Sequence, residues 1–555
     1  MKLIGALKAM ETKRGMKAIK RMLGCKKEIG ALCLGLVCSM SLSMTGCGAT
    51  NDSTSSNQSS AQLSIQSGEH LSSRSASMEQ ATEEIEQGQV AQEVSEAQKL
   101  VPVSSTSDFT YNHIAPIVEE AIATYTSKNG LVRIEKKPSY YEVYLDLEKG
   151  SHYDVGYAYG EAIRAVYPDF TDIMEPYLYE NIYATFPELT EGFSPIIYRM
   201  EEVMKSLPVD YKEEMLGMAE ALVWLTEESV EKAEIHEEGK NIDRAVDKDA
   251  EGMLGAENFI MDGKLSTEEA LLMHLVPDVL RGTQCSGVAV YGDKSATGQT
   301  ITVRLLEWLM GNENQMATAH AVVHFQNGEK SFTSYGILGL LQMISGSNAE
   351  GVFVGILDSE TGGVYEVEDK RSYPFELRYA IEHFSSAKEV GEYMISHGKA
   401  FTFSHNILIT DAHTAYVVEN NMDEGGKTSL RTADSNLMNS IDWNHSEAIA
   451  VVNSFALEGN KDNMTDSDHN MIRWKKFNER LAEHEKISVG DLKDIVTRDN
   501  PNQYGAHIYS DYTYQMIVID SVTGSVEIAF APTSDEFPVK PDFIRVTENL
   551  YEDNK

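Results

Sequence analysis

The stretch "RGTQCSGVAVYGDKSATGQTITVRLLEW", residues 281 to 308, decides the fold because the spacing of apolar residues changes within it. Two strand-length runs with alternating apolar residues, beginning at Cys285 and near Ile301, flank the turn-forming segment "DKSATGQ". The stretch is therefore predicted to form a β-hairpin. Its first strand begins at Cys285, and its second strand carries Arg304 and Glu307 near its end.

Strand-length runs continue after this hairpin to the end of the chain. They are "HAVVHFQ", "KSFTSYGIL", "GVFVGILD", "FTFSHNILIT", "TAYVVEN", "AIAVVNSF", "YQMIVID" and "SVEIAFAP". Two pairs of helical segments fall between strand groups: "PFELRYAIEHF" with "SAKEVGEYMISHG", and "HNMIRWKKFNERLAEH" with "SVGDLKDIVTRD". This order predicts an α+β fold in which two layers of antiparallel sheet are flanked by helices.

Before the hairpin, residues 109 to 284 show mainly the three- and four-residue spacing of amphipathic helices. Predicted helices include "YNHIAPIVEEAIATYTS", "PIIYRMEEVMKSLP" and "DYKEEMLGMAEALVWL". Gly156 and Gly160 lie one helical turn apart in "YDVGYAYGEAI", where close helix packing is favoured over a binding role. The polar stretch from 226 to 252 is interpreted as a solvated insertion.

The first 46 residues resemble a bacterial export signal, with a basic region ahead of the apolar run "IGALCLGLVCSMSLSM". The following "MTGC" resembles the lipobox of bacterial lipoproteins, which implies cleavage before Cys47 and lipid attachment to its sulfur. An ordinary secretory signal or an uncleaved anchor is the alternative. A lipidated chain would sit on the outer face of the cytoplasmic membrane, held there by its N-terminal lipid.

The composition from Cys47 to residue 108 is rich in Ser, Gln and Glu and poor in aromatic residues, which predicts a disordered tether. Four regions are therefore expected: a signal peptide (1–46), a lipidated cysteine with a tether (47–108), a mostly helical segment (109–284) and a core (285–555). The formal charge of −39 makes nucleic acid an unsuitable partner, because binding it needs a basic face.

Cys285 is the one thiol that a mature lipoprotein would keep free. The chain has five cysteines, of which Cys25, Cys33 and Cys38 lie in the predicted signal and Cys47 in the predicted lipobox. A single cysteine cannot form an internal disulfide, so Cys285 is either an inert core residue or a reactive group.

Several motifs, taken in order, resemble those of the N-terminal-nucleophile (Ntn) hydrolases of the penicillin acyltransferase and choloylglycine hydrolase type. They are the hairpin from Cys285 to Trp308, then "SGSNAEGVFV", "AIAVVNSF" and "DSDHNMIRWKKF", with "YDVGYAYGEAI" upstream. The resemblance implies a four-layer αββα sandwich, the Ntn-hydrolase core (285–555), preceded by a mostly helical propeptide or α-chain segment (109–284). It also implies hydrolysis or acyl transfer of a small-molecule acyl amide at its linear C–N bond, with no cofactor.

The resemblance also implies roles for individual residues. Cleavage between Gln284 and Cys285 would free an α-amine, whose ordinary pKa of about 7.7 to 8.0 suits it to take the thiol's proton. The implied catalytic set is the nucleophile Cys285, Arg304 favouring its thiolate, Glu307 orienting the amine, Asn453 and Asn348 as donors to the substrate oxygen, and Arg473 as a second nearby arginine.

This chain departs from the family pattern at several positions. Glu307 stands where the family has aspartate, Leu305 where asparagine is usual, and Ser286 where threonine is usual. Gln284 replaces a residue that is often glycine. In addition, Arg304 and Glu307 are three apart on a strand and would point to opposite faces, so a strand end or bulge would have to bring Glu307 to the amine.

Each candidate also has a purely structural interpretation. Cys285 and Asn453 are compatible with a buried core, Asn348 with a turn, and Arg304, Glu307 and Arg473 with a solvated surface. The histidines lack metal-ligand spacing, so no metal is predicted. Ser386 and Glu389 form a helix-capping box rather than a Ser-x-x-Lys site.

Two other functions remain open. One is a solute-binding or adhesive surface lipoprotein, and the other is a degenerate Ntn fold without activity. An uncut chain would be expected of both. The sequence does not predict an oligomeric state.

Overall fold

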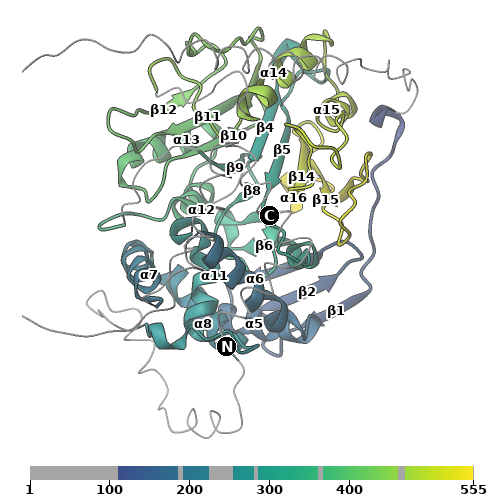
Figure 1. Cartoon of the computed structure of the whole chain (residues 1–555). Helices are drawn as coiled ribbons and strands as arrows, with labels where there is room; N and C mark the ends of the chain where they lie inside the picture. Colours follow the sequence, from purple (N-terminus) through teal and green to yellow (C-terminus); the bar gives the residue numbers. More distant parts are fainter. Residues whose placement is uncertain are drawn as a thin grey trace, which may run out of the picture. The chain divides into compact units, whose positions relative to one another are not determined.

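A computed structural model describes residues 110–185, 192–223, 254–280, 285–359, 367–460 and 469–553. Two β-sheets with helices against them make up this part of the chain (Figure 1). The predicted signal, Cys47, the tether, Gln284 and the whole polar insertion (226–252) lie outside the described residues.

The smaller sheet holds the predicted hairpin at its centre. Its strand order is β13-β4-β5-β14-β15-β16, and every neighbouring pair is antiparallel. The strands are β4 (Cys285–Val290), β5 (Ile301–Glu307), β13 (Ala448–Val451), β14 (Thr513–Asp520), β15 (Ser525–Phe530) and β16 (Ile544–Thr547).

The larger sheet has the order β1-β2-β3-β6-β7-β8-β9-β10-β11-β12. Its strands are β1 (Ala123–Thr126), β2 (Val132–Lys136), β3 (Tyr141–Asp146), β6 (His320–Gln326), β7 (Phe332–Ile337), β8 (Ser345–Asn348), β9 (Phe353–Asp358), β10 (His405–Thr410), β11 (Ala415–Asn420) and β12 (Thr428–Arg431). All pairs are antiparallel except β3 with β6. Residues before Cys285 therefore contribute strands to the same sheet as residues after it.

The two sheets pack face to face. The Thr302 hydroxyl on β5 donates to the Thr410 hydroxyl on β10 at 3.1 Å, across the space between the sheets. Gly287 on β4 lies so close to β10 that an added Cβ would meet Leu408 at 2.8 Å. The inner faces of β4 and β5 are thus buried against the larger sheet, and any polar side chain there is removed from water.

Helices cover the outer faces of both sheets (Figure 1). α12 and α13 pack on the larger sheet, whereas α14 and α15 pack on the smaller one. The helices are α5 (His152–Val166), α6 (Phe170–Thr185), α7 (Ser194–Ser206), α8 (Val209–Leu222), α11 (Thr267–Val279), α12 (Tyr373–His383), α13 (Ala387–Ser396), α14 (His469–Ala482), α15 (Val489–Val496) and α16 (Leu550–Asp553). The predicted α+β class is confirmed, with an αββα layering and a mostly helical segment ahead of it.

Every run that the sequence predicts as a strand after Cys285 contains one, while β8, β12 and β16 were not predicted. The helix predicted for "YNHIAPIVEEAIATYTS" is wrong. That segment holds a short 3-10 turn, an extended stretch and β1. Pro116 disfavours a helical conformation at the residue before it. In addition, β1 forms backbone hydrogen bonds with the edge of β2, and the spacing of apolar residues does not predict this pairing.

Two smaller predictions are confirmed. Gly156 and Gly160 on α5 permit close contact with α8: an added Cβ would lie 2.1 Å from the Glu214 carbonyl oxygen and 2.7 Å from the Ala221 Cβ, respectively. Ser386 accepts a hydrogen bond from the Glu389 N–H at 3.3 Å, as an N-cap does. Neither feature points to binding or catalysis.

Among the described residues, no helix combines the length and apolarity that crossing a membrane requires.

Candidate active site

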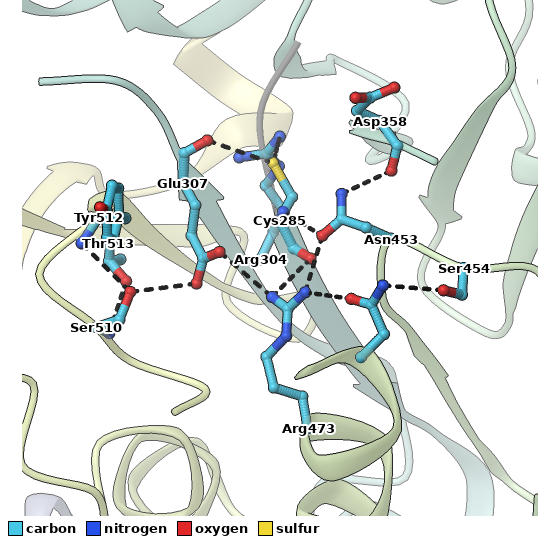
Figure 2. A network of polar contacts seen from close by, with 11 residues as sticks. Cys285, Arg304, Glu307, Asp358, Asn453, Ser454, Arg473, Ser510, Tyr512 and Thr513 are labelled. Atoms are coloured by element: carbon cyan, nitrogen blue, oxygen red, sulfur yellow. Dashed lines mark hydrogen bonds and ion pairs between the residues drawn. The ribbon is translucent and has the colours of Figure 1, made fainter. Parts of the chain in front are cut away.

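Cys285 is the first residue of β4 and pairs with Leu306 on β5. Its side chain is 3% exposed, and its thiol contacts the carbonyl oxygen of Glu307 at 3.9 Å. The hairpin therefore sets the position of the sulfur at the end of the strand pair. Figure 2 shows the polar side chains that converge on it.

Arg304 lies on the same face of the hairpin as Cys285, because it pairs with Gly287 two residues along β4. Its Nη2 donates to the Cys285 sulfur at 3.5 Å and to the Ile356 carbonyl oxygen at 2.5 Å. Gly355 makes room for it, since a Cβ there would lie 2.9 Å from the Arg304 Nε. The guanidinium is thus held between the two sheets, against the sulfur.

Asn453 continues the register that places β13 beside β4. Val451 pairs with Gly287, so Asn453, two residues later, comes opposite Cys285. Its Oδ1 accepts a hydrogen bond from the Cys285 backbone nitrogen at 2.6 Å, and its Nδ2 donates to the Asp358 carbonyl oxygen at 2.6 Å. The side-chain amide therefore orients the nitrogen of the candidate nucleophile and connects it to β9.

Arg473, on α14, joins the other groups into one network. Its Nη1 donates to the Cys285 carbonyl oxygen at 3.0 Å, and its Nη2 donates to Asn453 Oδ1 at 2.9 Å. The same Nη2 donates to Asn470 Oδ1 at 2.6 Å. This arginine is fully buried and holds the backbone of Cys285 from the helix side of the small sheet.

Glu307 reaches the network from the opposite face to Arg304, as the strand spacing predicts. Its Oε2 forms an ion pair with Arg473 at 3.3 Å, and its Oε1 accepts a hydrogen bond from the Ser510 hydroxyl at 3.5 Å. The short hydrogen bond from the Cys285 nitrogen goes to Asn453. The Glu307 carboxylate thus contacts Arg473, which in turn holds the backbone of Cys285 (Figure 2).

Burial dominates the electrostatics of this cluster. Burial raises the pKa of the Cys285 thiol, and the positive charge of Arg304 opposes that rise. Burial also raises the pKa of the Glu307 carboxyl, against the charge of Arg473. A thiol in this environment is largely protonated near neutral pH, so a base has to remove its proton before it can act as a nucleophile.

Asn348 is placed elsewhere, at the end of β8. Its Nδ2 donates to the carbonyl oxygens of Ile381 and Phe384, both at 3.0 Å. Its Oδ1 accepts from the backbone N–H groups of Glu350 at 3.2 Å and Val352 at 3.1 Å. Both amide hydrogens are engaged in tying the turn to the end of α12, which fits the turn interpretation rather than a donor to the substrate oxygen.

Two members of the network were not predicted. Asn470 supports Arg473 from the same face of α14, and its i,i+3 spacing in "HNMIRW" was the available signal. Ser510 lies in an irregular segment before β14 and touches Glu307. Its sequence surroundings carry no periodic pattern that would single it out.

In the described ranges, no group of three or more His, Cys, Asp and Glu side chains is placed to hold a metal ion. Nor does any histidine of these ranges form a hydrogen bond with Cys285 or an electrostatic contact that alters its pKa. The chemistry of the cluster is that of a thiol, a backbone nitrogen, two arginines, a carboxyl and amides.

The sequence matches no family model, and no curated protein matches it. Solved structures do match. A Caenorhabditis elegans ortholog of N-acylethanolamine-hydrolyzing acid amidase is 12% identical with a TM-score of 0.30, covering 42% of this chain and 92% of that chain. A mutant conjugated bile acid hydrolase from Clostridium perfringens is 12% identical with a TM-score of 0.31, and the match covers 48% of this chain and 94% of that chain.

Penicillin V acylase from Agrobacterium tumefaciens is 12% identical with a TM-score of 0.29, covering 44% of this chain and 83% of that chain. At this identity the likenesses concern the fold, and nothing about the chemistry of this chain follows from them.

Proposed function

We propose that the chain is a cysteine Ntn hydrolase that cleaves a linear carboxamide through a thioester on Cys285. One observation carries the proposal: separate polar groups hold the nitrogen and the sulfur of the same residue. The nitrogen is 2.6 Å from Asn453 Oδ1, and the sulfur is 3.5 Å from Arg304 Nη2. A residue that acts with both atoms needs both to be oriented.

Cleavage of the Gln284 to Cys285 bond would supply the base that the buried thiol lacks. The nitrogen of the new α-amine would be the atom that Asn453 now positions. Its ordinary pKa of about 7.7 to 8.0 lets it accept a proton near neutral pH. The amine would be joined to the sulfur through two carbon atoms, close enough for direct or water-mediated transfer.

The reaction would then run in two halves. The α-amine takes the thiol proton, the thiolate sulfur attacks the substrate carbonyl carbon, and the C–N bond breaks as the protonated amine of Cys285 gives its proton to the leaving nitrogen. A water molecule next attacks the thioester, which releases the carboxylic acid and restores the thiol. Transfer to a second amine in place of water is the acyltransferase variant of the same steps.

Arg304 supports this scheme by its charge and its remaining donors. Its Nε and Nη1 are buried and have no hydrogen-bond partner in the described part of the chain. A fixed cation beside the sulfur favours the thiolate, and unpartnered N–H groups are available to the oxygen that becomes negative in the transition state. The Asn453 side-chain amide and the Arg473 guanidinium would be further hydrogen-bond donors near Cys285.

Export and lipid attachment belong to the proposal and rest on the sequence of residues 1 to 47. Metabolic labelling with a radioactive fatty acid tests this part. We expect label on the membrane-associated wild type and none on a Cys47→Ala variant. Labelling of both variants, or a wild type found wholly in the soluble fraction, would contradict the lipoprotein hypothesis.

Intact mass spectrometry of residues 48 to 555, beside a Cys285→Ala control, tests the nucleophile. We expect the wild type to yield a fragment that begins at Cys285, and the control to remain whole. A Cys285→Ser variant retains a weaker nucleophile and should be cut more slowly. A whole chain in all three variants would remove the α-amine base and favour a binding protein or a degenerate fold.

Substrate turnover needs a second measurement. The cut protein is incubated with N-acyl amides of increasing chain length, and the peptide that begins at Cys285 is searched for an added acyl mass. Acylation confined to this peptide supports the thioester. Acid release without any acyl mass, unchanged in Cys285→Ala, would place the chemistry at another residue.

A further inference from the structure

An apolar pocket includes Trp308, which follows the Glu307 that contacts the candidate nucleophile. One buried side chain in this pocket has no hydrogen-bond partner among the residues that the structure describes. Residues of α6, α11, the end of β5 and the loop between β7 and β8 line this pocket. Its walls include Leu178, Val276, Trp308, Leu338 and Leu340. Gln342 is the exception in this apolar lining.

The pocket begins close to the sulfur. The Glu307 carbonyl oxygen lies 3.9 Å from Cys285 Sγ, and the amide nitrogen of the wall residue Trp308 belongs to the same peptide group. Oxygen and nitrogen of one peptide group are about 2.3 Å apart, so that nitrogen lies within about 6 Å of the sulfur. Trp308 is thus the wall residue through which the pocket adjoins the surroundings of Cys285.

Gln342 is 1% exposed, and neither its Nε2 nor its Oε1 has a hydrogen-bond partner in the described ranges of the chain. The other polar wall group is already used, because the Tyr177 hydroxyl accepts a hydrogen bond from Trp308 Nε1 at 2.5 Å. A buried amide without partners is costly unless something satisfies it. Gln342 thus has an NH2 group and a carbonyl oxygen that both lack a described partner within an apolar wall.

The loop that carries Gln342 is held on both sides. The Gly339 N–H donates to the Tyr159 hydroxyl at 2.8 Å, and the Leu341 carbonyl oxygen accepts from Arg378 Nη1 at 3.1 Å. Beyond Gln342, the Ile344 carbonyl oxygen accepts from the Ile356 N–H at 2.9 Å. The loop backbone is therefore anchored before a ligand arrives, which is what selective binding requires.

We propose that this pocket binds the acyl chain of the substrate and that Gln342 selects chains bearing a neutral hydroxyl group. The inference rests on the proposed function, because it places the acyl chain of the Cys285 thioester. A hydroxyl donates to Oε1 and accepts from Nε2, so it satisfies both free atoms of Gln342. A carboxylate or an ammonium group would lose its hydration in an apolar wall that offers no opposite charge, so charged chains are excluded.

The test uses acyl anilides of one chain length, with a hydroxyl at successive carbons and an unsubstituted parent. For the wild type, kcat/KM is expected to be at least about tenfold higher for one or two adjacent hydroxyl positions than for the parent. In Gln342→Leu this preference should vanish, and the parent should react as well as or better than in the wild type. Gln503→Leu, at an exposed glutamine, is the matched control and should retain the wild-type preference.

A binding arm separates the two ways in which the idea can fail. The same amides are titrated into Cys285→Ala, and into Cys285→Ala with Gln342→Leu, by calorimetry. Turnover without any hydroxyl preference would overturn the Gln342 inference and leave the hydrolase proposal standing. Hydroxyl-selective binding that depends on Gln342, with no turnover by the wild type, would overturn the hydrolase proposal and support the pocket assignment.

The melting temperature shows whether Gln342 is needed for packing, because replacing a glutamine that only supports the fold would lower it. Gln342→Leu removes an unpartnered amide from an apolar wall, so we expect the unliganded variant to melt no lower than the wild type. A clearly lower melting temperature, together with an unchanged hydroxyl preference, would assign Gln342 to packing and overturn the inference.

Discussion

Arg304 and Arg378 are both fully buried, but they differ in whether carboxylates balance their charge. Arg378, on α12, donates from Nη1 and Nη2 to both carboxylate oxygens of Glu214 at 2.5 and 2.9 Å, and from Nε to Glu382 at 2.8 Å. Arg304 has the Cys285 sulfur and one carbonyl oxygen as partners. Within the part of the chain that the structure describes, no carboxylate forms an ion pair with it.

The pKa directions express the same difference. Burial alone would lower the pKa of Arg378, but Glu214 and Glu382 raise it above its ordinary value. Burial lowers the pKa of Arg304, and the nearby thiol opposes this only in part. The Arg378 charge is balanced within the fold and links α8 to α12. The Arg304 charge has no such balance, so it is available to stabilise a negative charge that forms during a reaction, such as a thiolate.

The strongest test removes the balanced charge. Arg378→Met leaves Glu214 buried without its main cation, so the free energy of unfolding should fall by about 3 to 5 kcal/mol. Urea unfolding at pH 7 measures this. Arg498→Met is the matched control, since its ion pair with Glu483 is exposed and should contribute less than about 1 kcal/mol. Equal losses of unfolding free energy in the two variants would mean that the buried Arg378 ion pairs do not stabilise the fold more than an exposed ion pair does.

A buried carboxyl that forms no ion pair within the described residues extends the comparison to the opposite charge. Asp278, at the end of α11, accepts hydrogen bonds from Ser372 at 2.6 Å and Thr402 at 2.8 Å. Burial raises its pKa to about 7. Because the folded pKa lies above the ordinary value, its contribution to stability is full below about pH 4 and is lost as the pH rises through 7.

Asp278→Asn should remove that loss. We expect the variant to exceed the wild type at pH 8 by about 1 to 3 kcal/mol in unfolding free energy, and to differ little from it at pH 4. Chemical unfolding over this pH range measures the difference. Parallel pH profiles for the two proteins would show that Asp278 is ionised in the folded state.

Removing the unbalanced charge should affect reactivity rather than stability. Arg304→Met deletes the cation beside the sulfur, so alkylation of Cys285 by iodoacetamide at pH 7 should slow by at least about tenfold. The free energy of unfolding should stay within about 1 kcal/mol of the wild type or rise, because no buried carboxylate loses its partner. Alkylation of both proteins in urea controls for the reagent.

A large loss of stability in Arg304→Met, with unchanged alkylation, would give Arg304 the same role as Arg378 and end the contrast between them.

The strand pattern predicts the part of this site that lies on the hairpin, whereas Asn453 and Arg473 were expected from the family resemblance. Cys285 and Arg304 share a face through strand register, and Asn453 comes opposite Cys285 through the register of the neighbouring strand. Asn348 could not be judged in this way. Whether its amide hydrogens are free depends on where α12 ends, and that is settled by tertiary packing rather than by the "SGSNAEG" motif.

The same limit applies to the strands before Cys285. β1 to β3 form where the larger sheet offers a free edge, through the parallel pairing of β3 with β6. Parallel partners distant in sequence leave no turn signal between them. The helical spacing in residues 109 to 126 therefore suggested the wrong element, although the helices further along were predicted correctly.

The smallest expected effect concerns Glu307, where the family resemblance implies aspartate. Glu307 meets Arg473 at 3.3 Å and Ser510 at 3.5 Å, both longer than an ideal charged hydrogen bond. In Glu307→Asp the carboxylate withdraws by about 1.5 Å, one carbon–carbon bond. Arg473 would retain Asn453, Asn470 and the Cys285 carbonyl oxygen, so its position should change little.

We therefore expect Glu307→Asp to slow cutting before Cys285 by less than about fivefold, which corresponds to less than about 1 kcal/mol. A time course by mass spectrometry after rapid purification measures this rate, with Ser510→Ala as the matched loss of the other Glu307 contact. A slowing of a hundredfold or more in Glu307→Asp alone would mean that the carboxylate acts on the Cys285 nitrogen directly. Glu307 would then have the same kind of role as Arg304, a charge that takes part in the reaction and does more than hold Arg473 in place.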